Sequence, residues 1–168
     1  GHVFHTKSDT EVIVHAWESW GADCVKRFRG MFAFALWDRN QQTFFMARDR
    51  LGVKPMYYAL LDNGLLLFGS ELKSILAHGG LKRDIDPCAV EEYFALGYVA
   101  EPRTIFKQGL KLPPAHTLVM RRGDRLPSPK PYWDVRFTLD SRVNFQDAQS
   151  ELVRRLQESV RLRMIAEV

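Results

Sequence analysis

Asp9 is the residue whose type and position most directly suggest substrate recognition. It lies in Ser8-Asp9-Thr10-Glu11, just before an apolar pattern with helical spacing. A carboxylate at the start of a helix is favoured by the helix dipole and by the free backbone amides, and the local sequence favours this structural role. In the alternative interpretation, the carboxylate points into a pocket and pairs with the ammonium group of an amino-acid substrate.

A dense group of charged residues follows later in the chain, in Arg48-Asp49-Arg50-Leu51-Gly52-Val53-Lys54-Pro55. Glycine and proline at these positions are typical of a constrained loop between strands. Guanidinium and carboxylate groups this close together favour ion pairs that hold such a loop in one shape. We therefore predict a structural role for this segment.

The cysteines and histidines do not have the spacing of a metal site or of a nucleophile. Cys24 and Cys88 lie far apart, with no CxxC or Cys/His pattern, and are expected to pack as small apolar side chains. No glycine-rich loop resembles a phosphate site. The histidines are expected to make polar contacts at the surface and at helix ends, and they are His2, His5, His15, His78 and His116.

The composition is that of an ordinary globular domain. The chain has 168 residues, of which 46% are hydrophobic and 26% charged, and this excludes disordered, collagen-like and coiled-coil classes. A net charge of +4, with acids and bases interleaved, gives no support for nucleic-acid binding. No apolar run approaches the roughly 18 residues of a membrane span, and no signal peptide opens the chain. The cysteine usage favours a reducing, cytoplasmic setting.

Apolar periodicity predicts one helix followed by two hairpins. The helix starts near Ser8 and stops at Gly21. Strands are expected at 31–38 and 43–48, and again at 55–61 and 65–69, where Asp62-Asn63-Gly64 supplies the turn. The strand at 31–38 is almost continuously apolar, so we expect both of its faces to be covered.

The second half of the chain combines helices with proline-rich, β-like segments. A short helix is expected at 71–76, and a second helix opens at Asp86-Pro87. Short strand-like runs occur between residues 101 and 133. The polar segment 138–144 has the composition of a linker, and apolar residues at helical spacing predict a long amphipathic helix from Phe145 onward.

Several blocks of sequence occur in an order and at a spacing far more specific than any single motif. They are SDTEVI at 8–13, RGMFAFALWD at 29–38, RDRLGVKPMYY at 48–58, GSELK at 69–73, DPCAVEEYF at 86–94, YVAEPRTIF at 98–106 and KLPPAH at 111–116. This series strongly resembles the glutamine-hydrolysing asparagine synthetases, and more particularly the branch of exosortase-associated amidotransferases in bacterial exopolysaccharide gene clusters. The resemblance covers nearly the whole chain.

The resemblance implies an α+β fold of the N-terminal-nucleophile class, an αββα sandwich in which two antiparallel sheets lie between helical layers. Residues 1–137 would form the C-terminal part of a class II glutamine amidotransferase domain. Residues 138–168 would form a linker and the first helix of the asparagine synthetase domain. Because the chain opens without methionine and its apolar pattern runs on to Val168, we expect an interior fragment, incomplete at the N-terminus of the fold.

The family chemistry implies a role for Asp9. In this family the glutaminase domain releases ammonia from glutamine, and the ammonia attacks aspartate that ATP has adenylated. Asp9 matches the family aspartate that holds the α-ammonium group of glutamine. The resemblance implies no cofactor within this fragment, and ATP with Mg in the full-length protein, which we expect to be a cytoplasmic homodimer.

The catalytic residues of the family are expected upstream of this chain. The family nucleophile is an N-terminal cysteine whose own α-amine acts as the base, and an Asn-Gly pair forms the oxyanion hole. Neither Cys24 nor Cys88 has a free α-amine, so neither replaces that nucleophile. We therefore expect the fragment alone to be inactive, with no metal site and with Asp9 as its one substrate-binding residue.

Two alternative functions stay open at this point. The acceptor of ammonia need not be aspartate, because the acceptor is chosen in the synthetase domain. A sugar or a secondary-metabolite carboxylate, linked to exopolysaccharide synthesis, is one alternative. The other is a non-catalytic interaction domain of the same fold with a vestigial glutamine site.

Overall fold

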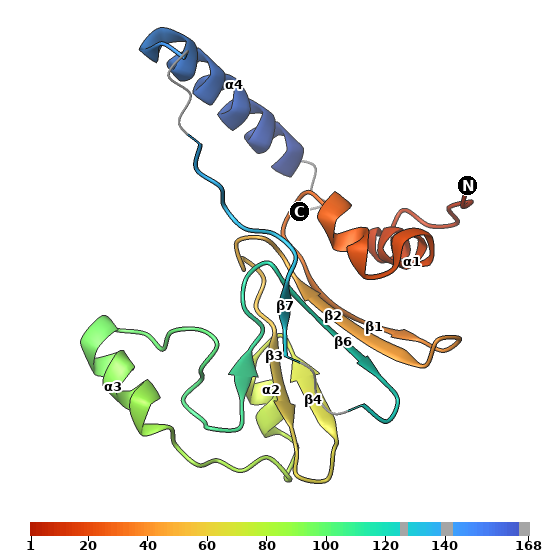
Figure 1. Cartoon of the computed structure of the whole chain (residues 1–168), viewed down its shortest axis with the longest axis vertical. Coiled ribbons are helices and arrows are strands. Elements are labelled where there is room, and N and C mark those ends of the chain that lie inside the picture. The colour runs from red at the N-terminus through yellow and green to blue at the C-terminus, as the bar shows by residue number, and fades with distance from the viewer. Residues whose placement is uncertain (125–127, 139–142, 165–168) are drawn as a thin grey trace. The chain divides into compact units, whose positions relative to one another are not determined.

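The computed structural model describes residues 1–124, 128–138 and 143–164 (Figure 1). These residues form two compact units, Gly1–Asp134 and Val135–Val168. Part of the predicted linker, residues 139–142, lies outside the described residues. The assignment of residues 138–168 to a second domain therefore stays a prediction. None of the described helices is long and apolar enough to cross a membrane.

The first unit opens with the predicted helix. Helix α1 spans Asp9–Trp20 and is capped by Ser8, whose hydroxyl oxygen accepts a hydrogen bond from the backbone N–H of Thr10. It ends at Gly21, which adopts a positive φ of 55°. A short 3-10 helix, η1 (Gly21–Arg27), continues the chain toward the first strand.

The strands form two antiparallel sheets. Both predicted hairpins are confirmed, but they belong to different sheets. The first sheet has the order β1-β2-β6-β7 and consists of β1 (Ala33–Asp38), β2 (Thr43–Arg48), β6 (His116–Arg121) and β7 (Lys130–Pro131). The second sheet has the order β4-β3-β5 and consists of β3 (Tyr57–Leu60), β4 (Leu66–Gly69) and β5 (Leu110–Lys111).

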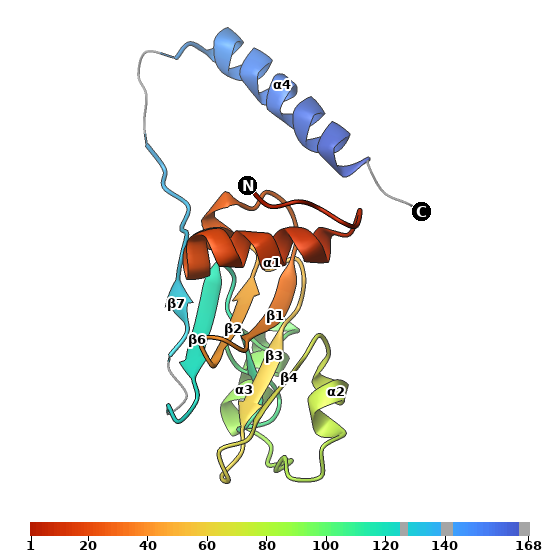
Figure 2. The same ribbon diagram turned by 90° about the vertical axis from the view of Figure 1, so that its right-hand side faces the viewer.

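The two sheets pack face to face between helices. Helix α1 crosses strands β6, β2 and β1 (Figure 2), and Trp17 packs against Phe45 on that face of the first sheet. On the opposite face of the same sheet, Phe44 packs with Tyr58 of the second sheet. The short helix α2 (Leu72–Leu76) covers the outer face of the second sheet through Ile75. This order of layers is the predicted αββα sandwich.

Strand β2, rather than β1, is the strand that is buried on both faces. All six residues of β2 are buried, because it lies between β1 and β6 and under α1. Strand β1 also packs on both faces, with Phe34 and Leu36 toward α1 and Ala33 and Ala35 toward the second sheet, but it is only partly buried and lies at the edge of its sheet. Trp37 of β1 is 47% exposed, since no neighbouring strand or helix of the described chain covers it.

Helix α3 (Pro87–Leu96) begins as predicted, since the Asp86 carboxylate accepts a hydrogen bond from the backbone N–H of Cys88. Its large apolar side chains, however, are exposed, and Phe94 is 82% exposed. Cys88 is also exposed, so its predicted packing as a buried apolar group is wrong. Ala89 is the one residue of this helix that is buried, and Val90 and Glu92 are partly buried.

The second unit consists mainly of helix α4 (Phe145–Arg163), which confirms the predicted long helix. Asn144 caps it by accepting a hydrogen bond from the backbone N–H of Asp147 at 2.9 Å. Glu151 pairs with Arg154 and Arg155 along the solvent-exposed surface. Its apolar residues at helical spacing are exposed.

Candidate functional site

Asp9 lies at the first position of α1 and lines two adjoining cavities. The larger cavity has a volume of about 470 Å³ and runs between the start of α1 and the loop that contains Lys54 and Pro55. The smaller has a volume of about 330 Å³ and extends toward Arg27 and Phe28. The predicted binding residue therefore faces open space on two sides.

The Asp9 carboxylate is not needed to cap its helix. Ser8 already supplies the side-chain acceptor, with its hydroxyl oxygen 3.2 Å from the backbone nitrogen of Thr10. Within residues 1–124, 128–138 and 143–164, the Asp9 carboxylate makes no hydrogen bond or ion pair. Because the Asp9 carboxylate has no such partner, it can pair with a cationic group of a ligand without breaking a hydrogen bond or ion pair of the protein.

Asp49 organises the loop that forms the wall of the larger cavity. Its side chain is 1% exposed. One carboxylate oxygen accepts hydrogen bonds from the backbone N–H groups of Leu51 (3.1 Å) and Val53 (3.0 Å). The other accepts from Lys54 (2.9 Å) and Phe32 (3.3 Å), which both line the cavity. One buried carboxylate thus fixes the loop to the segment that enters β1.

Arg48 holds the same loop from its other side. Its guanidinium group is buried and donates to the carbonyl oxygens of Lys54 (2.8 Å), Gly52 (2.7 Å) and Leu112 (2.7 Å). It also forms an ion pair with Glu101 at 2.8 Å. These contacts confirm the structural role predicted for the charged segment at 48–55.

Gly52 is required by this packing. Its φ is 65°, and a Cβ atom at this position would lie 2.8 Å from Pro114 Cγ and 3.0 Å from the Arg48 guanidinium group. A side chain here would therefore push apart the loop, the arginine and the segment before β6. The glycine in the predicted constrained loop is thus explained by both conformation and space.

The larger cavity combines opposite charges with apolar walls. Asp9 and Lys54 both line it, together with the apolar residues Met31, Phe34 and Pro55. A cavity of this kind suits a small zwitterion, because an amino acid carries an ammonium and a carboxylate group on a short aliphatic body. The geometry therefore favours binding of a free amino acid.

Comparison with known proteins decides the family. The family model described as "Glutamine amidotransferase domain" matches residues 1–133. This chain belongs to that family. Its α+β architecture, with two antiparallel sheets between helices, confirms the fold class that the sequence predicts for such an amidotransferase domain.

Relatives of this amidotransferase domain include two named as asparagine synthetases. "Asparagine synthetase [glutamine-hydrolyzing] 3" of Bacillus subtilis is 39% identical over 169 residues, covering 100% of this chain and 27% of the relative. "Putative asparagine synthetase [glutamine-hydrolyzing] 2" of Methanocaldococcus jannaschii is 42% identical over 132 residues, covering 77% of this chain and 25% of the relative. "Amidase chyE" of Penicillium rubens is 35% identical, covering 96% of this chain and 24% of the relative. The chain therefore spans about a quarter of the length of these curated relatives.

The cysteines of the amidotransferase domain lie away from Asp9. Cys24 is fully buried beneath α1, and this burial raises the pKa of its thiol to about 11. Cys88 is exposed near the start of α3. Neither residue lines either of the two cavities at Asp9. Neither thiol is therefore placed to attack a substrate bound there.

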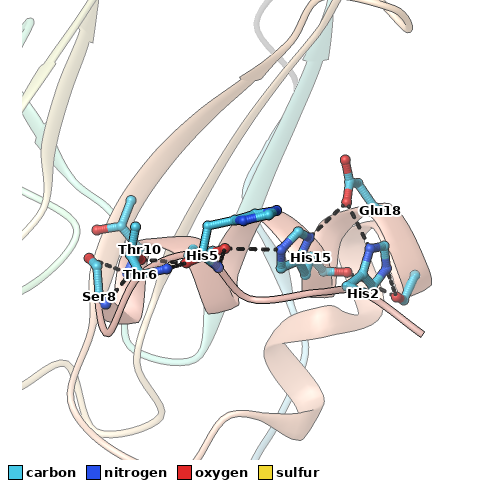
Figure 3. A network of polar contacts seen from close by, with 9 residues as sticks. His2, His5, Thr6, Ser8, Thr10, His15 and Glu18 are labelled. Carbon is cyan, nitrogen blue, oxygen red and sulfur yellow. Dashed lines mark hydrogen bonds and ion pairs between the residues drawn. The ribbon is translucent and has the colours of Figure 1, made fainter.

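One cluster of the amidotransferase domain was not predicted from the sequence. His2 lies against His15 on α1, with ring centroids 4.4 Å apart, and both approach Glu18 (Figure 3). The Glu18 carboxylate is the main cause that raises the pKa of His15 above 6.5. The spacing of His15 and Glu18 is that of neighbours on a helix surface, but nothing in the sequence places His2 beside them.

Glu11 ties the segment before α1 to the same helix. Its carboxylate accepts hydrogen bonds from the backbone N–H groups of His5 and Thr6, each at 2.7 Å, and from the Thr6 hydroxyl group. The hydroxyl contact is the main cause that lowers the pKa of Glu11 to about 2. Polar contacts of histidines at a helix surface are thus confirmed for this segment.

Proposed function

We propose that this chain is part of a glutamine-hydrolysing asparagine synthetase, which releases ammonia from glutamine and transfers it to ATP-activated aspartate. The observation that carries the proposal is the match of residues 1–133 to the amidotransferase family, together with two relatives that bear this name. Glutamine is the ammonia donor in this proposal, and aspartate and ATP are substrates of the whole protein. We further expect a cytoplasmic homodimer, which light scattering of the whole protein tests.

In this proposal Asp9 holds the α-ammonium group of glutamine. Three observations support the assignment: Ser8 caps the helix in its place, the carboxylate has no protein partner in the described chain, and it lines both cavities. A carboxylate and an ammonium group form a charge-assisted hydrogen bond that discriminates amino acids from uncharged amides. Lys54 also lines the larger cavity, and its ammonium group is our candidate partner for the substrate carboxylate.

We expect this chain by itself to release no ammonia from glutamine. The described cysteines do not reach the cavities at Asp9, and the thiol of Cys24 stays protonated because its pKa is about 11. The nucleophile and the oxyanion hole are proposed to come from sequence upstream of Gly1. ATP and Mg are proposed to bind the synthetase domain, so this part of the protein takes no cofactor.

The experiment is an Asp9→Asn substitution in the whole protein that carries this chain. Loss of one charge-assisted hydrogen bond, worth about 1.5–3 kcal/mol, predicts a rise in the KM for glutamine of roughly tenfold to a hundredfold. Synthesis supported by free ammonia should be unchanged, because it bypasses the glutamine site. Asp62→Asn serves as the control, since Asp62 is exposed and pairs only with Lys82 in a surface turn.

An unchanged KM for glutamine in Asp9→Asn, with the protein folded, would refute this role of Asp9. Equal losses of glutamine-dependent and ammonia-dependent synthesis would also count against it, because they would indicate general damage. The family assignment does not depend on either outcome.

A second candidate function has a different acceptor. Two relatives are named "Amidase chyE" and "Amidase chry2", and they are 35% and 36% identical to this chain over 96% and 98% of its length. The amidotransferase part is therefore also similar, at a somewhat lower identity than to the two synthetases, to proteins whose names do not mention asparagine. An exopolysaccharide-linked acceptor, such as a sugar or another carboxylate, belongs to this candidate.

One assay on the whole protein separates the candidates. Glutamine, aspartate and ATP are supplied together, and asparagine and AMP are measured along with glutamate. Asparagine and AMP in equal amounts support the synthetase. Glutamate without consumption of aspartate indicates another acceptor, and no glutamate at all indicates a non-catalytic interaction domain of the same fold.

A further inference from the structure

Three side chains converge on one point beside helix α1. Glu18 Oε2 lies 3.4 Å from His2 Nδ1 and 3.1 Å from His15 Nδ1 (Figure 3). The ligand atoms of these three residues all lie within 4.8 Å of one another. His15 and Glu18 belong to adjacent turns of α1, whereas His2 comes from the segment before it.

The hydrogen bonds of His2 fix where its ring hydrogen lies. Its Nε2 atom is 3.0 Å from the Ser19 hydroxyl oxygen, and this hydroxyl group donates its own hydrogen to the carbonyl oxygen of His15 at 2.9 Å. Ser19 can therefore only accept from His2, so the neutral ring carries its hydrogen on Nε2. The lone pair of His2 Nδ1 then faces Glu18.

Each ring nitrogen of His15 also lies near a carboxylate oxygen. Its Nε2 atom lies 3.5 Å from a carboxylate oxygen of Glu11, and its Nδ1 atom faces Glu18. A neutral imidazole has one hydrogen for these two carboxylates. The Nδ1 atom makes the shorter contact, a hydrogen bond of 3.1 Å with Glu18 Oε2, whereas the buried Nε2 atom has no hydrogen-bond partner among the described residues. Two imidazole nitrogens and one carboxylate oxygen therefore converge, and a positive charge, carried by a proton or by a metal ion, stabilises such a group.

We propose that His2, His15 and Glu18 bind a divalent transition-metal ion of the zinc type. Zinc bonds to imidazole nitrogen and carboxylate oxygen are about 2.0–2.2 Å long, so tetrahedral ligand atoms are about 3.3–3.6 Å apart. Of the two separations from Glu18, 3.4 Å lies within that range and 3.1 Å lies just below it. Two imidazoles and one carboxylate form a known zinc ligand set, which leaves a fourth position for water.

The groups behind the ligands support the assignment. Metal-bound imidazoles commonly have a hydrogen-bond acceptor at their second nitrogen. Ser19 has that position for His2, at 3.0 Å from Nε2, and a carboxylate oxygen of Glu11 lies 3.5 Å from Nε2 of His15. Glu11 is itself held by the backbone N–H groups of His5 and Thr6.

Binding requires one movement. The two rings stack with an angle of 18° between their planes, so an ion cannot lie in both planes at once. His2 lies in the exposed segment before α1, and turning its ring brings its lone pair toward the ion. The ion would then tie residues 1–8 to α1. This inference does not depend on the glutamine chemistry.

The test is a titration of the chain with Zn²⁺ at slightly alkaline pH against a chromophoric chelator, followed by absorption of the Co²⁺ form. The α-amine is acetylated so that Gly1 adds no nitrogen ligand. We expect one ion per chain and tetrahedral Co²⁺ absorption. His2→Gln and His15→Gln should each weaken Zn²⁺ binding at least roughly tenfold, and the control His78→Asn should leave it unchanged.

Zn²⁺ binding that is equal in the unaltered chain and in both ligand variants would overturn the proposal. So would a titration that detects no bound ion. A cluster that holds only protons gives a third pattern, in which the ring resonances of His2 and His15 shift with pH but do not respond to Zn²⁺, and that pattern also overturns it. His2 is exposed and outside the core, so its replacement cannot fail by unfolding the chain.

Discussion

Asp49→Asn tests the reasoning about the loop that builds the cavity wall. The substitution keeps the shape of the side chain and removes its charge, so it leaves no cavity. Asp49 is 1% exposed, so water does not replace lost hydrogen bonds. Its two oxygens each accept two backbone N–H groups, from Leu51 and Val53 on one side and from Phe32 and Lys54 on the other.

The magnitude follows from this arrangement. An asparagine side chain has one oxygen, so in either orientation two backbone N–H groups face an amide N–H₂ group instead of an acceptor. Hydrogen bonds to a charged group contribute about 1.5–3 kcal/mol each, so we expect a loss of about 3–6 kcal/mol in the free energy of unfolding. This is a large part of the roughly 5–15 kcal/mol that stabilises a typical domain.

Urea unfolding followed by tryptophan fluorescence measures this loss. With an m-value of about 2 kcal/mol per M, the midpoint should fall by about 1.5–3 M. The control is Asp62→Asn, which removes an exposed ion pair with Lys82 and should cost at most about 1 kcal/mol. A midpoint for Asp49→Asn that falls no further than that of the control would refute the assigned role of the buried carboxylate.

Two further predictions concern side chains away from the cavity. Cys88 should be alkylated by iodoacetamide far faster than Cys24, because Cys24 is fully buried and its pKa is raised to about 11. Peptide mass spectrometry measures the alkylation of each cysteine, and equal labelling of the two would contradict the structure. Asp38→Asn should reduce the sensitivity of stability to acid. The indole N–H of Trp17 donates a hydrogen bond to the Asp38 carboxylate at 2.8 Å, and this bond is the main cause that lowers the pKa of Asp38 below 3.8 in the folded protein. The bond therefore stabilises the fold above pH 3.8, and this stabilisation is lost as the pH falls through the pKa of Asp38 in the folded protein. Urea midpoints at neutral and acidic pH give the comparison, and equal acid losses in both proteins would count against it.

The sequence by itself determined most of the local structure. Ser8 and Gly21 predict the ends of α1, and the structure confirms both, because capping depends on residues within one helical turn. Asn63-Gly64 predicts the turn of the second hairpin, where Gly64 has a φ of 82°. The ordered blocks of family motifs also identified the amidotransferase family, which the comparison confirms.

The part of the site that sequence could locate was Asp9 at a helix start. It could not show that Ser8 would take over the capping, nor that the carboxylate would line two cavities. The sequence could not give the partners of the charged segment either, because Arg48 contacts Glu101 and Leu112, which lie 53 and 64 residues away along the chain. Its structural role could be predicted, but its geometry could not.

Only the tertiary structure decided which surfaces are covered. The two hairpins look alike in sequence, yet one joins β6 under α1 and the other joins β5 over α2. This pairing makes β2 the doubly buried strand and leaves β1 at an edge. It also exposes Cys88 and brings His2 to His15 and Glu18. Turns and helix caps depend on neighbouring residues, so the sequence by itself determined them. Burial and long-range contacts arise only when distant segments pack together, so the tertiary structure decided them.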